Sequence, residues 1–366
     1  MKKIWTFVIT GGPCSGKTTG MSIIEQELSN RGYYVLIIPE TATELISTGI
    51  RPFGKSLDVS TFQYVVMKKQ LQKEQLYQEV TEKLPYEKIV ILLDRGIVDS
   101  KIYLTEEQFQ EVLELCSLNE VEARDRYDAV LHLVTAADGA EEFYTLANNT
   151  ARTETAEQAR NLDKRGISSW TGHPHLRVID NSTNFEGKME KLLSEIYSVL
   201  GEPIPLEIER KYLIEKPNLE KLAKQTAITV VDIVQTYLKS QDNSEIRVRQ
   251  RGQNGSFTYY YTEKRKISAT KRIELERKIT EKEYISYLSN MDTSRTPLVK
   301  KRICFVYNAQ YFEVDLFGFS DDKALMEIEL TNENSAIDFP RFINVICEVT
   351  DNPKYRNYNL SKTQTL

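Results

Sequence analysis

Hydrophobic and polar positions follow two different rhythms along the chain. In residues 1–200, short continuous apolar runs alternate with segments of helical periodicity. The apolar runs predict buried strands at Ile4–Thr10, Tyr34–Ile38, Ile89–Asp94, Ala129–Val134 and Leu176–Ile179. Helices are expected between them, including Lys17–Arg31, Ser60–Gln78 and Glu106–Leu118. Short apolar strands separated by helices predict an α/β domain with a parallel sheet covered on both faces.

After the linker signal at Gly201–Pro205 the pattern changes to strict alternation, which is typical of antiparallel strands. Strands are predicted at Leu206–Ile214, Thr229–Leu238, Glu245–Arg251, Phe257–Lys264, Arg272–Ile279, Arg302–Tyr307, Tyr311–Phe317 and Ala324–Leu330. Few helices interrupt them, with candidates at Asn218–Lys224 and Glu281–Leu288. The pattern predicts an α+β domain built on an antiparallel, eight-stranded barrel. We therefore expect two domains, 1–200 and 206–366, each long enough to bury its own core.

Composition narrows the possible functions. A formal net charge of −5 gives no global reason to expect a nucleic-acid partner. The four cysteines show no Cys-x-x-Cys spacing and the chain has three histidines, so neither a zinc site nor a disulfide framework is expected. No apolar segment reaches the length of a membrane span, and the run at Ile4–Thr10 leads directly into a glycine loop. We expect a cytoplasmic protein.

The segment Gly11–Thr18 reads Gly-Gly-Pro-Cys-Ser-Gly-Lys-Thr and fits the pattern G-x-x-x-x-G-K-[ST]. It follows an apolar strand and opens a helix, which is the context that phosphate binding requires. Backbone N–H groups of such a loop surround a β-phosphate at the positive end of the helix. Lys17 would reach the β- and γ-phosphates, and the Thr18 hydroxyl would ligate Mg²⁺. The predicted nucleotide-binding residues are Gly11, Gly12, Ser15, Gly16, Lys17, Thr18, Thr19, Asp94 and Arg95.

Further charged residues near this loop have two interpretations each. Asp94 ends a buried strand, where a second Mg²⁺-organising carboxylate belongs, although a surface turn would also explain it. Glu40 could act as the catalytic base toward an acceptor hydroxyl, or serve a helix N-terminus. A basic stretch predicts either a phosphate-covering lid helix or a solvated charged face, with members Arg152, Arg160, Lys164 and Arg165.

Several segments together resemble an AAA-type ATPase-like family related to nicotinamide-riboside and deoxynucleoside kinases. They are Gly11–Thr18, Pro39-Glu40-x-x-x-Glu44-Leu45, Asp94-Arg95-Gly96-x-x-Asp99, Trp170, His173 and Ile179-Asp180-Asn181. The similarity covers roughly residues 3–200 and implies an ATP- or GTP-binding, kinase-like core.

Charged residues recur at every second position of the predicted barrel strands, so each set shares one face. The sets are Glu207/Glu209/Lys211, Arg247/Arg249, Lys264, Arg272/Glu274/Glu276, Lys300/Arg302, Glu313/Asp315 and Glu327/Glu329. Because most intervening residues are apolar or aromatic, we expect the charged face inside the barrel; a solvated face is the alternative. Lysine and arginine there would bind a linear polyphosphate, and carboxylates would hold Mg²⁺ or Mn²⁺. Such a metal could activate water for hydrolysis.

The opening Glu207-x-Glu209-x-Lys211 resembles the CYTH family of triphosphate tunnel metalloenzymes. Further matches are Thr262-x-Lys264, Arg272-x-Glu274-x-Glu276, Lys300-x-Arg302, Glu313-x-Asp315, Glu327-x-Glu329 and Glu348-Val-Thr-Asp351 with Tyr355 and Asn357. The similarity runs from about residue 206 to 362. The family includes adenylate cyclases, thiamine triphosphatases, and inorganic or RNA triphosphatases.

This resemblance implies roles for the charged residues. Metal ligands would be Glu207, Glu209, Glu327 and Glu329, and phosphates would contact Lys211, Arg247, Arg249, Lys264 and Arg302. The full predicted metal set is Thr18, Asp94, Glu207, Glu209, Glu274, Glu276, Glu313, Asp315, Glu327 and Glu329. Arg272 and Lys300 complete the phosphate set, and the predicted catalytic residues are Glu207, Glu209, Lys211 and Glu40. Whether Lys300 or Lys301 points inward depends on the strand register.

A kinase-like domain followed by a CYTH domain resembles two arrangements. One is the plant tunnel proteins with a uridine-kinase-like domain; the other is the animal family named for a translocation defect of the TRP-like photoreceptor channel. The AAA-type motifs fit the second better, and that family has been linked to GTP and phosphoinositide binding. The leading hypothesis is an ATP- or GTP-binding protein with a metal-dependent triphosphate-hydrolysing tunnel. The alternatives are a nucleotide-regulated protein that binds polyphosphate or phosphoinositide headgroups, and a nucleoside-type small-molecule kinase.

Overall fold

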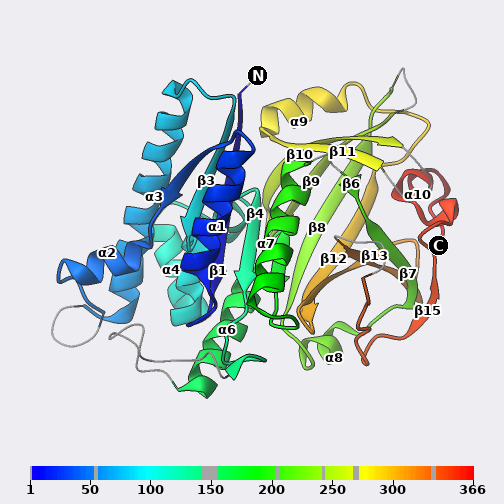
Figure 1. The fold of residues 1–366 in the computed structure, drawn as a ribbon. Helices are drawn as coiled ribbons and strands as arrows, with labels where there is room; N and C mark the ends of the chain where they lie inside the picture. Colours follow the sequence, from blue (N-terminus) through cyan, green and yellow to red (C-terminus); the bar gives the residue numbers. More distant parts are fainter. Residues whose placement is uncertain are drawn as a thin grey trace. The chain divides into compact units, whose positions relative to one another are not determined.

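The computed structural model describes residues 2–52, 57–141, 155–202, 206–240, 244–266, 272–330 and 335–366. For residues 206, 207, 265, 266 and 272–274 it describes the backbone alone. The chain divides into two compact units, Met1–Leu193 and Ser194–Leu366 (Figure 1). Within the described ranges, no helix combines the length and apolarity needed to cross a lipid bilayer.

A parallel five-stranded sheet forms the centre of the first unit, with the strand order β2-β3-β1-β4-β5. Its strands are β1 (Lys3–Gly11), β2 (Tyr34–Ile38), β3 (Lys88–Asp94), β4 (Ala129–Leu133) and β5 (Leu176–Ile179). Phe7 and Val8 are adjacent in β1 and point to opposite faces, yet both are fully buried. This confirms the predicted sheet covered on both faces.

Helices of the first unit begin where the sequence offers caps. Asp58 accepts a hydrogen bond from Thr61 N–H at the start of α3, and Thr155 with Gln158 forms a capping box at the start of α6. The helix predicted to end at Leu118 stops at Leu115, because the chain turns at Ser117 with a φ of 56°. The helical segments are α1 (Lys17–Asn30), α2 (Thr41–Ser47), α3 (Val59–Lys83), η1 (Ile97–Tyr103), α4 (Glu106–Leu115), α5 (Glu120–Arg124), α6 (Ala156–Trp170) and α7 (Phe185–Leu200).

The second unit is an antiparallel sheet with the strand order β15-β7-β14-β13-β12-β8-β9-β10-β11-β6. Its strands are β6 (Leu206–Glu207), β7 (Glu209–Glu215), β8 (Ile228–Tyr237), β9 (Glu245–Gln253), β10 (Ser256–Lys266), β11 (Arg272–Ile279), β12 (Leu298–Tyr307), β13 (Gln310–Phe317), β14 (Lys323–Glu329) and β15 (Val345–Glu348). Its helical segments are α8 (Leu219–Ala223), α9 (Glu281–Leu288), η3 (Pro353–Tyr355) and α10 (Asn357–Thr363).

The first predicted strand of this unit closes the sheet into a barrel. It is interrupted at Ile208, so that its first part, β6, pairs with β11 and its second part, β7, pairs with β14. Because β11 and β14 belong to opposite ends of the strand order, one continuous segment joins the two ends. β15, which the alternation did not predict, pairs with β7 outside this ring.

The two faces of the barrel wall differ in chemistry. One face carries an apolar cluster in which Phe305, Phe312 and Met326 pack with Leu222 of α8 and with Ile343. The other face carries the predicted charged residues. Many of those whose side chains are described are buried, among them Lys211, Lys300 and Asp315. In β12, for example, Arg302 is 7% exposed, whereas Val299 on the opposite face is 62% exposed. The charged face is therefore the interior.

Candidate functional site

The glycines of the phosphate loop are required by close packing and by backbone geometry. Gly11 and Gly16 have φ values of 145° and 89°. A Cβ atom on Gly12 would lie 2.7 Å from Asp163 Oδ1, and one on Gly11 would lie 2.1 Å from the carbonyl oxygen of Leu133. Gly16 precedes the first turn of α1 and, as glycine, offers no capping side chain. The N–H groups at this helix end are thus presented for an anion such as phosphate.

Lys17, the first residue of α1, extends back over the loop. Its Nζ donates to the carbonyl oxygen of Gly11 at 3.1 Å and to that of Gly12 at 3.4 Å. Burial, with a smaller contribution from nearby Arg95, lowers the pKa of Lys17 to about 8, although Asp94 and Glu40 act in the opposite direction. A phosphate bound here would therefore meet an ammonium group that other charges compensate only in part.

A second group of side chains gathers where β3 ends. Burial raises the pKa of Asp94, and its buried Oδ1 has no hydrogen-bond partner among the described residues. The next residue, Arg95, has a φ of 70°, and its Nε donates to Glu40 Oε1 at 2.8 Å. An orphaned carboxylate oxygen beside the phosphate loop fits a hard cation such as Mg²⁺.

Glu40 is held by its neighbours. Burial alone would raise its pKa, but Arg95 and a hydrogen bond from Thr43 Oγ1, at 2.5 Å, outweigh burial and lower it. A carboxylate with a lowered pKa is a weak base, so this arrangement favours an orienting contact to Arg95 over proton abstraction.

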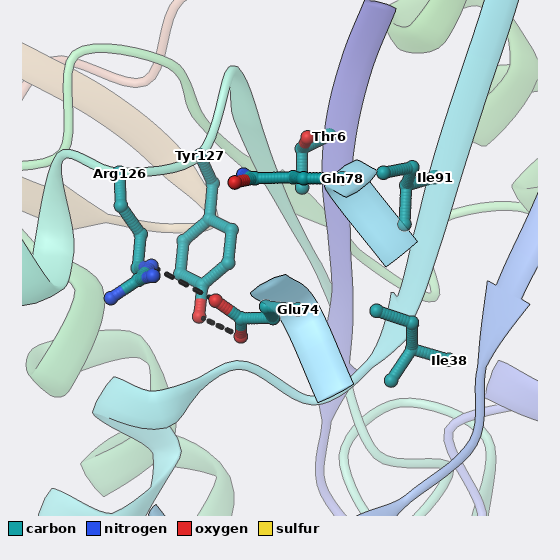
Figure 2. A pocket seen from close by; sticks show the side chains of 7 residues that line it. All are labelled: Thr6, Ile38, Glu74, Gln78, Ile91, Arg126 and Tyr127. Carbon is teal, nitrogen blue, oxygen red and sulfur yellow. Dashed lines mark hydrogen bonds and ion pairs between the residues drawn. The ribbon is translucent and has the colours of Figure 1, made fainter. Parts of the chain in front are cut away.

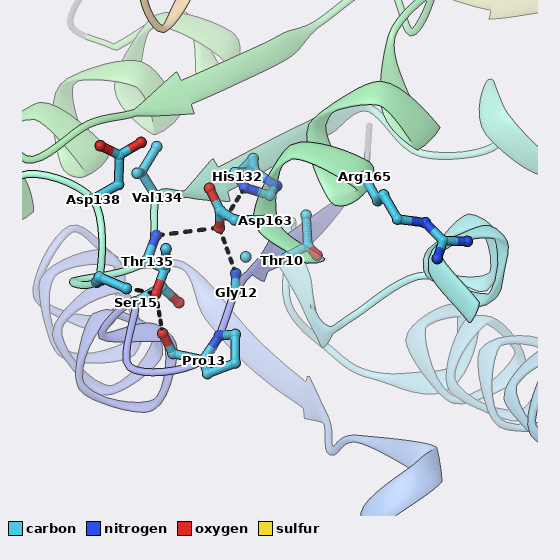
Figure 3. A network of polar contacts seen from close by, with 12 residues as sticks. Thr10, Gly12, Pro13, Ser15, His132, Val134, Thr135, Asp138, Asp163 and Arg165 are labelled. Carbon is cyan, nitrogen blue, oxygen red and sulfur yellow. Dashed lines mark hydrogen bonds and ion pairs between the residues drawn. The ribbon is translucent and has the colours of Figure 1, made fainter. Parts of the chain in front are cut away.

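Asp163, which the sequence motifs did not include, contributes a buried carboxylate to the loop (Figure 3). Its Oδ1 accepts hydrogen bonds from Gly12 N–H at 2.8 Å and Thr135 N–H at 3.2 Å, and lies 3.1 Å from His132 Nε2. Burial would raise the pKa of Asp163, but His132 and the two N–H groups lower it. The carboxylate thereby ties α6 to the first part of the phosphate loop.

Lys188 of α7 supports the other side of the same loop. Its Nζ donates to Ser15 O at 3.0 Å, to Val134 O at 2.8 Å and to Asn181 Oδ1 at 2.7 Å. The residue is 4% exposed, and burial lowers its pKa to about 8. The loop is thus held by a carboxylate at one N–H group and by an ammonium at one carbonyl group.

The proposed lid residues make other contacts. Arg160 Nη1 donates to Ala137 O at 2.7 Å, and Arg165 Nη2 donates to Leu104 O at 3.2 Å. Arg152 lies outside the described residues. The described contacts hold α6 to its own domain.

A separate small cavity lies against the sheet and is lined by Thr6, Ile38, Glu74, Gln78, Ile91, Arg126 and Tyr127 (Figure 2). Glu74 contacts Arg126 Nε at 2.9 Å and accepts from Tyr127 Oη at 2.8 Å, while burial raises its pKa. Tyr127 Oη also accepts from Ile97 N–H at 3.1 Å. This network fixes the segment that follows Arg95 and has no contact with the phosphate loop among those described.

Ion pairs fill the interior of the barrel. Arg302, on β12, is bound by carboxylates from β13 and β14. Its Nε and Nη2 each donate to Asp315 at 2.7 Å, and Nη2 also donates to Glu327 at 2.6 Å. Arg302 Nη1 also pairs with Glu313, and Lys300 pairs with Asp315. Lys300 is buried and Lys301 is exposed, so the register places Lys300 inside.

Opposite charges shift the pKa of the interior groups in different directions. Burial would lower the pKa of Lys211, but Glu209 at 3.2 Å and Glu327 at 2.6 Å raise it. Burial and Arg302 lower the pKa of Lys300 to about 8. Burial raises the pKa of Glu313, although Arg302 opposes this.

The strand register brings the remaining predicted groups to the same face. Arg247 lies opposite Thr262 and Lys264 lies opposite Glu274 in the pairing of neighbouring strands. Arg249 Nη2 donates to Glu276 at 3.0 Å. Glu207, Arg272 and Glu274 are placed by backbone pairing alone, because their side chains lie outside the described part.

One end of the tunnel is closed by apolar side chains. Along the interior face, Leu213 follows Lys211, Leu325 precedes Glu327, and Phe317 follows Asp315. These residues form a cluster with Leu298, Val349 and Leu360, the last of which belongs to α10. Along the interior face, the charged layer therefore lies next to a buried apolar layer.

Two observations on the barrel carboxylates bear on metal binding, and they point in opposite directions. Across the described residues, no three carboxylate, histidine or cysteine side chains are grouped in a way that could hold a metal ion. Glu209 and Glu329, however, lie directly opposite each other on β7 and β14. Like charges at such a pair repel each other, and Lys211 Nζ, 3.2 Å from Glu209, compensates part of this repulsion. Oxygen ligands of this kind suit Mg²⁺ or Mn²⁺.

A signal for Asp163 and Lys188 was present in the sequence. Each occupies the buried stripe of an amphipathic helix: Asp163 stands between Ala159 and Gly166, and Lys188 lies four residues before Leu192. A charged residue on an apolar stripe needs buried polar partners, and here both find them in the phosphate loop.

Known protein families match two separate parts of the chain. Residues 6–188, half of the chain, match the family described as the AAA domain, and residues 205–337 match the CYTH domain. An inorganic triphosphatase of known structure is 27% identical and covers 44% of this chain and 97% of its own, with a TM-score of 0.30. A protein from Pyrococcus horikoshii OT3 is 20% identical over 35% of this chain and 80% of its own, with a TM-score of 0.27. No curated protein matches the chain. The chain therefore belongs to the AAA-domain family and joins this nucleotide-binding-like domain to a CYTH domain.

Proposed function

We propose that this protein binds a nucleoside triphosphate, ATP or GTP, in its AAA domain and hydrolyses a triphosphate substrate in its CYTH barrel. One observation carries the proposal: the interior of a closed barrel holds lysine, arginine and carboxylate side chains on nearby strands. Burying so many charges is costly, and an ordinary barrel of this size has an apolar interior. A polyanionic substrate with bound cations explains why charges occupy it.

The proposed role of each barrel residue follows from its charge. Lys211 and Arg302 would bind the phosphate oxygens once a substrate replaces part of their carboxylate contacts. Asp315 is fully buried and pairs with both Lys300 and Arg302, so it would hold these cations in position. Glu209 and Glu329, opposite each other in the register, would hold Mg²⁺ or Mn²⁺. When bound, the metal polarises the phosphate and lowers the pKa of a coordinated water.

In the AAA domain, the open helix end and Lys17 would bind the phosphates, with Thr18 and Asp94 supplying oxygen ligands to Mg²⁺. The order of the two domains supports the finer assignment to the family named for the translocation defect of the TRP-like channel. That assignment is part of the proposal.

A second candidate is a binding protein without turnover, in which the AAA domain regulates capture of polyphosphate or a phosphoinositide headgroup by the tunnel. The observation that favours it is the engagement of Asp315 and Glu327 by cations. In this arrangement the described carboxylates neutralise lysine and arginine instead of forming a ready metal site.

The test is release of phosphate and pyrophosphate from tripolyphosphate, ATP, GTP and thiamine triphosphate with Mg²⁺ or Mn²⁺. The full chain is compared with the double variant Glu207→Gln/Glu209→Gln and with Lys17→Ala. Loss of hydrolysis in the tunnel variant alone supports the hydrolase. Saturable tripolyphosphate binding without turnover in any protein contradicts it and favours the binding function.

A further inference from the structure

Phe185, the first residue of α7, lies against the phosphate loop. A Cβ atom on Gly16 would be 2.9 Å from Phe185 Cε2 and 3.6 Å from Cζ. Gly16 is the residue immediately before Lys17, at the open end of α1. The edge of an aromatic ring therefore contacts the point of the loop from which the phosphate-binding N–H groups project.

Phe185 differs from the other apolar residues of its helix. Met189, Leu192 and Ile196 continue the same stripe and are at most 4% exposed, whereas Phe185 is 50% exposed. Single exposed aromatics are ordinary on protein surfaces, so exposure alone carries little weight. What distinguishes this ring is that its partner is a glycine of the phosphate loop and that half of its surface stays open beside that loop.

The ring is also held in place. Lys188, in the same helical turn, makes its three hydrogen bonds to Ser15, Val134 and Asn181. One turn further, Met189 and Leu192 pack around Gly20 of α1. The start of α7 is thus fixed to α1 and to the loop, and ordering the ring for a ligand would cost little conformational entropy.

We infer that Phe185 is a stacking platform for the aromatic base of the ligand, so that the phosphate loop takes a nucleoside triphosphate in preference to bare triphosphate. This rests on the proposed nucleotide binding by the AAA domain. A nucleotide whose phosphates lie at the end of α1 carries its base one ribose away, beside the same loop. Stacking on an aromatic ring suits any base, because every base has a π-face.

The polar groups near Phe185 also indicate that the site tolerates different bases. Asn181 Nδ2 donates to the carbonyl oxygens of Thr135 and Asp138, and its Oδ1 accepts from Lys188. Its amide is therefore occupied within the protein and does not read a base edge. Asp180 Oδ1 likewise accepts from Ser182 and contacts Lys191. With the Asn181 amide occupied, the inference predicts that the ring binds adenine and guanine alike.

The experiment measures competition by unlabelled ATP, GTP and tripolyphosphate against labelled ATP on the full chain. Because the tunnel also offers a phosphate site, the signal used is the part of binding that Lys17→Ala removes. Phe185→Ala should weaken ATP and GTP by about tenfold, in the range found for base stacking, and leave tripolyphosphate unchanged. Phe185→Trp should restore both nucleotides. Leu115→Ala, which alters another exposed apolar residue of this domain, is the control.

Two results would overturn the inference while leaving nucleotide binding intact: equal weakening of all three ligands by Phe185→Ala, or no weakening of any. Phe185→Leu separates stacking from packing against Gly16, since leucine keeps apolar bulk without a π-face, and the inference requires the nucleotide preference to fall in this variant too. Absence of any Lys17-dependent binding in the wild-type chain would instead remove the proposed nucleotide site itself, and this inference with it.

Discussion

The phosphate loop and the charged tunnel differ in the atoms that each would present to its proposed phosphate ligand. In the loop they are backbone N–H groups of consecutive residues, shaped by glycine and held from behind by Asp163 and Lys188. In the tunnel they are side chains from strands distant in sequence, and these charges neutralise one another across the barrel. The loop N–H groups are uncharged and need no compensating charge. Each buried charge in the tunnel, by contrast, needs an oppositely charged partner.

The pKa values of Lys17 in the loop and Arg302 in the tunnel reflect this difference. Burial dominates for Lys17 and brings its pKa to about 8. Burial would also lower the pKa of Arg302, but Asp315, Glu313 and Glu327 outweigh it and raise the value. Removing Lys17 should thus spare the fold, and removing Arg302 should not.

The largest effect is expected for Arg302→Met. The variant leaves Asp315 and Glu327 buried without the guanidinium that binds them, and breaking a buried pair in this way costs about 3–5 kcal/mol. Urea unfolding, followed on the CYTH transition, should show the loss, and triphosphate hydrolysis should disappear. Lys301→Met, at the exposed neighbouring position, is the control. An unchanged unfolding midpoint for Arg302→Met would show that the interior charges are solvated.

The next effect concerns the pH dependence of nucleotide affinity. With a pKa of about 8, Lys17 is charged below pH 8 and loses its proton above it, whereas bound phosphates would keep it charged. Binding then takes up a proton, and affinity should fall by up to about tenfold per pH unit above pH 8. Dissociation constants for ATP between pH 7 and pH 9.5 test this. Lys17→Arg, which stays protonated, should flatten the profile. The same slope in both proteins would assign the titration to another group, with Lys188 the first to examine.

Sequence patterns predicted the framework of both regions because local rules determine it. β2 and β5 have the predicted bounds, Tyr34–Ile38 and Leu176–Ile179, since an apolar run between turn residues marks a buried parallel strand. Alternation likewise predicted β13 and β14 and, with them, the ion-paired face. The interruption at Ile208 was missed, because barrel closure depends on partners far away in the chain.

The candidate sites were predictable to the extent that they consist of contiguous motifs. Gly11–Thr18 needs only its own sequence and a preceding strand. Asp163 and Lys188 act on that loop from helices that follow it by well over a hundred residues, and only the tertiary structure shows which groups they bind. The inward position of Lys300 was left open for a related reason: three consecutive basic residues do not define a register.

A smaller effect is expected for Lys188→Met, which keeps the apolar stem and removes three hydrogen bonds behind the loop. Hydrogen bonds of charged groups are strong enough that loss of loop positioning should weaken ATP by about tenfold. Lys188→Arg should restore part of the affinity, because arginine can still donate to the carbonyl oxygens. Calorimetric titration with ATP measures both, with Lys191→Met as the control on the exposed side of α7. If Lys188→Met lowers thermal stability while ATP affinity is unchanged, the residue serves the fold alone.

The smallest effect should come from an ion pair on the outside of the same barrel. Arg210 on β7 makes two contacts to Glu348 on β15, at 2.9 Å and 2.6 Å, which is better geometry than several interior pairs have. Both side chains are more than a third exposed, however, so solvent already stabilises the separated charges. Arg210→Ala should therefore cost about 1 kcal/mol or less in urea unfolding, and this small loss should shrink further in high salt. Arg210 stands one residue before Lys211, so the chain itself provides the contrast between an exposed and a buried cation on one strand. A loss comparable with that of Arg302→Met would mean that contact geometry, and not burial, sets the dependence of the barrel on its ion pairs.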